Sequence, residues 1–138
     1  MDRVAVAAAR QGYKPDSIVC AGEVPQGRPT PLMIYQSLIE LQRWPLWRCV
    51  KVDDTVPGVV EGRNAGCWSV GVSLTGNGMA LSQEALEALP AAERDRRNKV
   101  IRQELRDAGA HFVIDSVADF LPCLTTIEEH IADGIRPE

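Results

Sequence analysis

The fold is decided by the stretch Lys51-Val-Asp-Asp-Thr-Val-Pro-Gly-Val-Val-Glu-Gly-Arg-Asn-Ala-Gly-Cys-Trp-Ser-Val-Gly-Val72. An apolar run ends there in two adjacent carboxylates, Asp53 and Asp54, and a turn, a short helix and a second apolar run follow. Strands that alternate with helices are typical of parallel βαβ units. Open sheets of this kind bind ligands beyond the carboxyl ends of their strands. The sequence therefore predicts that Asp53 and Asp54 lie at the ligand-binding end of a parallel sheet.

Further strands and helices are expected on both sides of this unit. The expected strands are 17–20, 48–52, 67–72 and 111–114, and the expected helices are 1–11, 31–43, 57–64, one beginning after Ser82, 91–108 and 117–132. The strands are apolar throughout, which is typical of a sheet covered by helices on both faces. The pattern therefore predicts a three-layer α/β core over residues 1–133, followed by a frayed tail, residues 134–138.

Composition limits the class of protein and its partners. A chain of 138 residues with 45% hydrophobic residues indicates one globular domain or part of one. A formal net charge of -4 argues against nucleic acid or an anionic membrane as a partner. No apolar run approaches the roughly 20 residues of a membrane span, and the first residues lack the layout of a signal peptide.

The cysteines and histidines give no pattern of metal ligands. The four cysteines are scattered without a CxxC pair: Cys20, Cys49, Cys67 and Cys123. Free thiols indicate a reducing, cytoplasmic location. Because His111 and His130 have no neighbours at ligand spacing, a zinc site is not expected.

The two adjacent aspartates allow two interpretations. An Asp before a short helix is a common helix N-cap and needs no metal. Two hard oxygen donors at a strand end also suit Mg²⁺, which is usually held by one or two carboxylates together with substrate phosphate. The carboxylates of Asp53 and Asp54 repel each other, and a nearby cation would offset that repulsion. From the residues alone both interpretations stay open.

Arg28 is the second candidate, because it stands between Gly27 and Pro29 in a stiff loop. It is either a solvated loop arginine or a fixed cation that neutralises a phosphoryl group and a nearby carboxylate. Lys51, inside the strand before the Asp pair, is expected to be a structural ion-pair partner.

Several segments carry a family resemblance that covers nearly the whole chain to about residue 120. They are Met1-Asp-Arg-Val-Ala, Gly12-Tyr-Lys-Pro-Asp16, Val24-Pro-Gln-Gly-Arg-Pro-Thr-Pro31, Val50-Lys-Val-Asp-Asp-Thr-Val-Pro-Gly58, Glu61-Gly-Arg-Asn-Ala-Gly66, Trp68-Ser-Val-Gly-Val72 and Gly109-Ala-His-Phe-Val-Ile-Asp-Ser116. Together they resemble the C-terminal half of the core domain of phosphonoacetaldehyde hydrolases, in the haloacid dehalogenase (HAD) superfamily. Gly-Arg-Pro is rather specific to this family, since many HAD relatives have Lys in place of Arg28.

The resemblance implies a HAD-like Rossmannoid fold and a reaction. The reaction is hydrolytic cleavage of the C–P bond of phosphonoacetaldehyde, a small-molecule phosphonate, to acetaldehyde and phosphate with Mg²⁺. By position, Asp54 resembles the family's Mg²⁺ ligand, and Asp53 a second ligand or a holder of metal-bound water. Arg28 resembles the catalytic cation that stabilises the phosphoryl group and the nucleophile. Some family members carry a further Asp at the position of Gly58.

The resemblance also implies that parts of the fold lie outside this sequence. No nucleophile motif, cap domain with its Schiff-base Lys, or Ser/Thr-Gly phosphate loop precedes the Asp pair. We therefore expect an incomplete core that lacks the nucleophile strand and is poorly stable and inactive alone. Its expected partner is the missing N-terminal half, and the complete protein is expected to be a homodimer. Two alternatives stay open: part of another HAD phosphatase or dehalogenase, and a non-catalytic HAD-like interaction protein.

Overall fold

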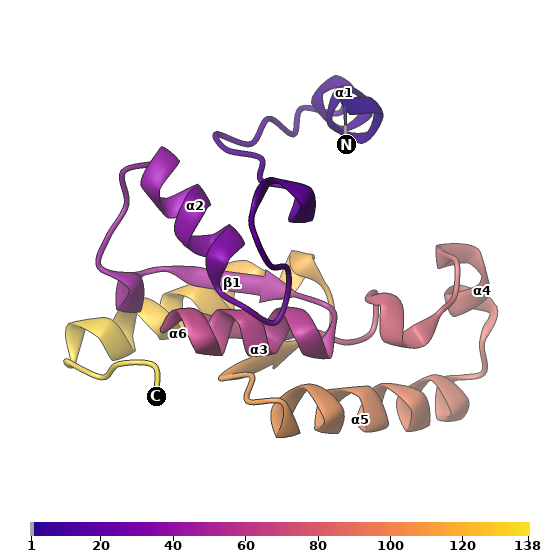
Figure 1. Ribbon diagram of the computed structural model, residues 1–138. Coiled ribbons are helices and arrows are strands. Elements are labelled where there is room, and N and C mark those ends of the chain that lie inside the picture. The colour runs from indigo at the N-terminus through magenta and orange to yellow at the C-terminus, as the bar shows by residue number, and fades with distance from the viewer. Residues whose placement is uncertain (1) are drawn as a thin grey trace.

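The computed structural model describes residues 2–138, with side chains from residue 5 onward. A parallel sheet forms its centre, and its strands follow the order β1 (Val50–Asp53), β2 (Trp68–Val72) and β3 (Phe112–Ile114). Val50 pairs with Trp68, and Val70 of β2 pairs with Phe112. The predicted α/β class and the parallel direction of the strands are confirmed (Figure 1).

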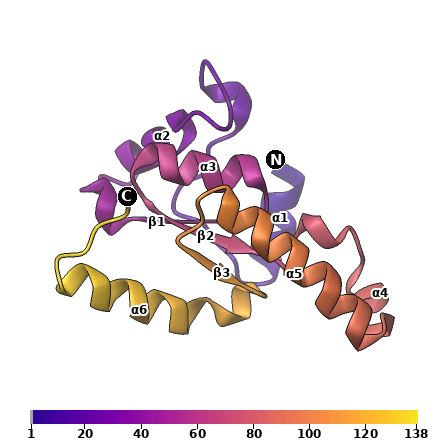
Figure 2. The same ribbon diagram turned by 90° about the horizontal axis from the view of Figure 1, so that it is seen from below.

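Helices cover both faces of the sheet. The described helices are α1 (Asp2–Arg10), α2 (Leu32–Glu40), α3 (Val56–Ala65), α4 (Gln83–Ala88), α5 (Ala91–Asp107) and α6 (Phe120–Ala132), of which α3, α5 and α6 pack on the strands. Figure 2 shows α3 and α5 on one face of the sheet and α6 on the other. This is the predicted three-layer arrangement. Among the described residues, no helix is long and apolar enough to cross a membrane.

The hydrophobic core has one part on each face of the sheet. Toward α3 and α5 it contains the buried residues Val59, Met79, Ile101 and Leu105. Toward α6 it contains Trp68, Val70 and Ile127. No residue from 5 to 57 is buried, so among the residues whose side chains are described the core comes from Gly58 onward.

The expected strand at 17–20 is wrong, because the structure assigns no strand there. A strand is defined by hydrogen bonds to a neighbouring strand, and no described residue pairs with this segment. The segment is extended and apolar, as the sequence indicates, but it lies apart from the sheet.

Other element boundaries differ by a few residues. The helix expected over 31–43 ends at Glu40, and Gln42 has a positive φ of 53°. The strand expected from 48 begins at Val50, because residues 46–48 form a short 3₁₀ turn. Residues 117–119 likewise form a 3₁₀ turn before α6.

Candidate active site

Asp53 ends β1, and its carboxylate turns back into the structure, where the side chain is 8% exposed. Its Oδ1 accepts hydrogen bonds from the Thr55 amide at 3.0 Å and the Thr55 hydroxyl at 2.7 Å. Its Oδ2 lies 3.1 Å from Lys51 Nζ and 3.5 Å from Arg28 Nη1. Burial by itself would raise the pKa of Asp53, but the Thr55 hydrogen bonds and the Lys51 charge outweigh burial and hold the pKa below its usual value.

Asp54 is directed toward a different loop. Its Oδ2 accepts a hydrogen bond of 2.8 Å from the backbone amide of Asn77, in the turn after β2. Gly76 makes this approach possible, because a Cβ on Gly76 would lie 2.7 Å from the Asp54 Cβ and 2.6 Å from the Val72 carbonyl oxygen. The adjacent carboxylates therefore contact different partners.

Thr55 supplies the N-cap of α3. Its hydroxyl accepts a hydrogen bond of 3.1 Å from the Gly58 amide, which satisfies one of the free N–H groups at the helix start. The same hydroxyl donates to Asp53. The capping side chain is thus Thr55, while Asp53 accepts from the capping residue itself.

Gly58 leaves room for the Asp53 carboxylate. A Cβ on Gly58 would lie 1.9 Å from the Asp53 Cγ. Any side chain at position 58 would therefore occupy the same space as this carboxylate. In this structure the Asp53 carboxylate fills the space that a side chain at position 58 would need; some members of the family that the chain resembles carry Asp there.

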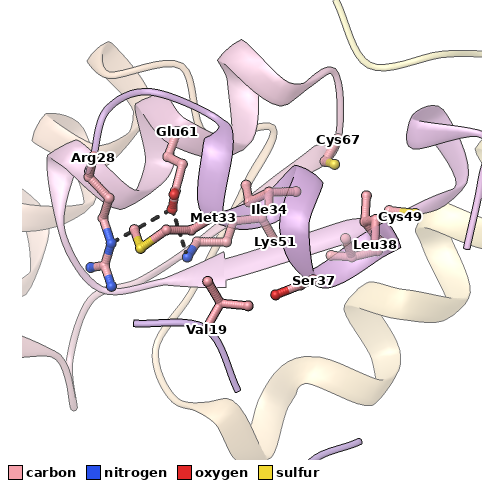
Figure 3. Close-up of a pocket in the computed structure, with 11 residues that line it drawn as sticks. Val19, Arg28, Met33, Ile34, Ser37, Leu38, Cys49, Lys51, Glu61 and Cys67 are labelled. Carbon is pink, nitrogen blue, oxygen red and sulfur yellow. Dashed lines mark ion pairs between the residues drawn. The ribbon is translucent and has the colours of Figure 1, made fainter. Parts of the chain in front are cut away.

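A cluster of two cations and two carboxylates surrounds this end of β1; it consists of Arg28, Lys51, Asp53 and Glu61. Lys51 Nζ lies 3.1 Å from Glu61 Oε2 as well as from Asp53, so Lys51 is the ion-pair partner that the sequence predicts. Arg28 Nε lies 3.7 Å from Glu61 Oε2. Figure 3 shows the three side chains of Arg28, Lys51 and Glu61 pointing toward one another.

Glu61 is the member of this cluster that sequence reasoning missed. Its side chain is 1% exposed and comes from α3. One feature of the sequence could have indicated its burial. Glu61 lies one turn beyond Gly58 on a helix rich in glycine and valine, and such a helix is not expected to have a solvated face. A buried carboxylate needs a cation, and Lys51 is the cation next to it.

The cluster borders a cavity of about 260 Å³ beside β1. Most of the other walls come from three segments: the extended segment 17–20, the loop that carries Arg28, and α2. The apolar lining includes Val19, Met33, Ile34, Leu38 and Val50. Arg28 is 45% exposed, so part of its guanidinium remains free for an anionic ligand.

The donor set suits part of a Mg²⁺ coordination sphere. No group of three or more Asp, Glu, His or Cys side chains at metal-binding geometry occurs among residues 2–138. From the described residues Asp54 accepts one hydrogen bond, whereas both Asp53 oxygens already face donors or cations. Because Mg²⁺ commonly takes one or two carboxylates and completes its shell with water and phosphate, Asp54 fits this role better than Asp53.

The fold and the site define a class of protein. The parallel sheet lies between two helical layers, with carboxylates at the carboxyl end of one strand, and the match to a solved structure identifies it as a HAD-like α/β core, of which this chain contains an incomplete one. A crystal structure of a phosphonoacetaldehyde hydrolase-like protein from Oleispira antarctica matches with a TM-score of 0.97 and 43% identity, over 99% of this chain and 50% of that chain.

Sequence relatives carry the same name. A phosphonoacetaldehyde hydrolase of Paraburkholderia phytofirmans is 47% identical over 99% of this chain and 51% of its own length. One of Bordetella pertussis is 44% identical over 99% of this chain and 50% of its own length. No family model matches the chain. The chain is thus homologous to part of the phosphonoacetaldehyde hydrolases, spans about half the length of these relatives, and fits their C-terminal half.

Proposed function

We propose that this chain supplies the metal-binding and phosphate-binding half of an active site that hydrolyses phosphonoacetaldehyde. The observation that carries the proposal is the convergence of Arg28 on the end of β1, where its Nη1 lies 3.5 Å from Asp53 although 25 positions separate the two residues. The names of the relatives support the hydrolase class and the substrate. Water and phosphonoacetaldehyde would give acetaldehyde and inorganic phosphate.

Asp54 and three members of the cluster have roles in this proposal. Asp54 would hold Mg²⁺, which when bound would neutralise phosphoryl oxygens. Arg28 contacts the phosphoryl group through the exposed part of its guanidinium, since a planar fork of N–H donors matches phosphate geometry. Asp53 and Glu61 set the position of Arg28 by their ion pairs. In phosphoryl transfer, positioning and charge neutralisation account for most of the catalysis.

The nucleophile and the lysine that forms a Schiff base would come from the half of the relatives that this chain does not match. The assembled protein would be a homodimer by the same resemblance. Four free cysteines are consistent with a reducing compartment such as the cytoplasm.

The test joins both halves in one polypeptide. The unmatched half of the Paraburkholderia phytofirmans relative is fused ahead of Met1, and release of acetaldehyde from phosphonoacetaldehyde is followed with and without Mg²⁺. We expect Mg²⁺-dependent turnover that falls at least about 100-fold in Arg28→Lys, the size of effect seen when one transition-state donor is lost. The control Arg106→Lys alters an exposed arginine on α5 and should leave turnover unchanged.

Two outcomes would contradict the proposal. One is a folded fusion that hydrolyses a phosphate ester such as p-nitrophenyl phosphate but leaves phosphonoacetaldehyde intact, which would indicate another HAD phosphatase. The other is turnover of phosphonoacetaldehyde that Arg28→Lys leaves unchanged.

A further inference from the structure

A second cavity lies at the opposite end of the sheet from the candidate active site. Asp53 ends β1, whereas Trp68 and Phe112, which line this cavity, begin β2 and β3. Because the three strands are parallel, the cavity lies at their amino ends. Its volume of about 600 Å³ is typical of a small-molecule site. None of the residues that line it belongs to the cluster around Asp53.

One wall of this cavity is aromatic. Trp68 and Phe112 come from the sheet, and His130 comes from α6. The centroid of the His130 ring lies 5.7 Å from that of Trp68 and 5.8 Å from that of Phe112. Three neighbouring rings offer a surface on which a planar group can pack.

Two arginines bring positive charge to the same cavity. Arg63 comes from α3, and its Nε would lie 3.1 Å from a Cβ on Gly109, so glycine at position 109 lets the Arg63 side chain lie across that turn. Arg136 follows α6, and its guanidinium carbon lies 4.8 Å from the centroid of the Trp47 ring, which holds it by a cation–π contact. Within residues 5–138, neither arginine forms a salt bridge with a carboxylate. Both cations therefore remain available to an anion.

His111 presents a hydrogen-bond donor beside Arg63. Its Nδ1 accepts a hydrogen bond of 2.8 Å from the Ser69 amide, so in the neutral ring the proton lies on Nε2. Burial and the charge of Arg63 lower the pKa of His111 and favour this neutral ring. Arg63 Nη1 lies 3.0 Å from Nε2. Since both atoms are donors, an oxygen that accepts from both would stabilise their approach.

The segment after α6 forms another side of this cavity. Gly134 has a φ of 79°, a left-handed conformation that favours glycine, and Figure 2 shows the chain turning back toward the sheet beyond it. Glu138 lines the cavity, and its backbone hydrogen-bonds to the His111 ring. An oxygen acceptor therefore already fits beside this ring. The Glu138 carboxylate forms no salt bridge among the described residues, so it does not neutralise the two arginines.

We propose that this cavity binds a small carboxylate that carries a planar ring. The carboxylate would accept from Arg63, Arg136 and the Nε2 of His111, in the place that the Glu138 backbone takes in this structure. A guanidinium fork matches the planar geometry of a carboxylate. The ring of the ligand would pack on the aromatic wall. The cavity thus selects for two features together, a negative charge and a flat apolar group.

The experiment titrates the protein with benzoate. The full chain carries ¹⁵N in its tryptophan side chains, and the fused protein of the activity test is titrated in parallel, so that a weakly stable chain does not decide the outcome. The indole N–H of Trp68 donates to the Trp47 carbonyl at 3.0 Å, so its NMR signal reports on this wall of the cavity. We expect a saturable shift of this signal with a dissociation constant of about 1 mM or lower. Benzamide, which has the same shape without the charge, and inorganic phosphate, which has no ring, should each bind at least about 10-fold more weakly.

Two variants test the cations separately. We expect Arg63→Gln and Arg136→Gln each to weaken benzoate binding at least about 10-fold, the effect of losing a hydrogen bond to a charged group. Arg136 lies after α6 and outside both parts of the core, so its loss cannot act by unfolding the sheet. The matched control Arg106→Gln removes the same charge from an exposed position on α5 and should bind like the parent protein.

Three results would overturn the inference. The first is a Trp68 signal that stays unchanged up to about 10 mM benzoate in both folded proteins, well above the expected dissociation constant. The second is benzamide or phosphate that binds as tightly as benzoate. The third is benzoate binding that neither arginine variant weakens. Each result is independent of whether the fused protein cleaves phosphonoacetaldehyde, because the cavity shares no residue with that site.

Discussion

Asp53 shows how a carboxylate can stay charged while nearly buried. Two hydrogen bonds from Thr55 and the ammonium group of Lys51 surround it, and together they hold its pKa below the usual value although burial acts in the opposite direction. A carboxyl group whose pKa is lower in the folded than in the unfolded chain stabilises the fold. That stability is fully present above the ordinary pKa of 3.8 and is lost as the pH falls through the lower folded value.

Removing the Lys51 charge should therefore shift the titration of Asp53. In Lys51→Met, we expect the pKa of Asp53 to rise and acid unfolding to begin at a higher pH. The variant also leaves the buried Glu61 with Arg28 alone, so we expect a loss of about 3 kcal/mol in the free energy of unfolding. Carboxyl ¹³C NMR of Asp53 and urea unfolding measure the two effects. The control Lys99→Met changes an exposed lysine on α5, and an Asp53 titration identical in all three proteins would contradict the account.

Gly58 offers a second test at the residue scale. Alanine normally stabilises a helix relative to glycine by up to about 1 kcal/mol. Here its Cβ would collide with the Asp53 carboxyl, so we expect Gly58→Ala to destabilise the protein by about 1–3 kcal/mol. The double variant Asp53→Gly/Gly58→Ala should recover most of the loss that the overlap causes. Urea unfolding followed by the fluorescence of the buried Trp68 measures both, and a stabilised single variant would show that the overlap is absent.

At the scale of elements, the β1–α3 connection places the site. The Thr55 hydroxyl caps α3 and donates to Asp53, so one side chain links the helix to the carboxylate. At the other end of α3, Gly66 has a φ of 78° and ends the helix in a left-handed conformation before β2. This left-handed ending is typical of glycine after a helix.

Loss of the Thr55 hydroxyl should have two consequences. We expect Thr55→Ala to lower the free energy of unfolding by about 1–2 kcal/mol, the usual cost of losing an N-cap, and to raise the pKa of Asp53. Thr55→Ser keeps the hydroxyl and should retain both properties. The cap account fails if the alanine and serine variants unfold at the same urea concentration.

The sequence predicted those strands and helices whose own residues follow a recognisable pattern. Periodic apolar positions and cap residues located the strands from β1 onward and the helices around them. The expected strand at 17–20 failed because its hydrogen bonds depend on a neighbour that the described residues do not provide. Asp53, Asp54 and Arg28 were predicted from the Asp pair and the Gly-Arg-Pro loop. Glu61 was missed because its burial against Lys51 depends on how α3 packs on β1, which spacing along the chain does not reveal.

At the scale of the whole molecule, the core is unevenly distributed. Within residues 5–138, every buried residue lies from Gly58 onward, and none lies in 5–57. Since small domains are only marginally stable, we expect the chain alone to unfold at low temperature over a broad range, and the mixture with the unmatched half to show a sharper transition at a higher temperature. Calorimetry of both samples measures this. A sharp, cooperative transition of the chain alone as a monomer would contradict the expectation.

The most direct test of the central claim is the C–P cleavage activity of the fused protein and its Asp54→Asn variant. Asn keeps the size of the side chain and an oxygen that can accept from the Asn77 amide, but it removes the charge that would hold Mg²⁺. The account predicts Mg²⁺-dependent release of acetaldehyde and phosphate in equal amounts by the parent fusion, and a loss of at least about 100-fold in Asp54→Asn. Turnover that Asp54→Asn leaves unchanged, or a folded parent fusion that releases no acetaldehyde, would contradict it.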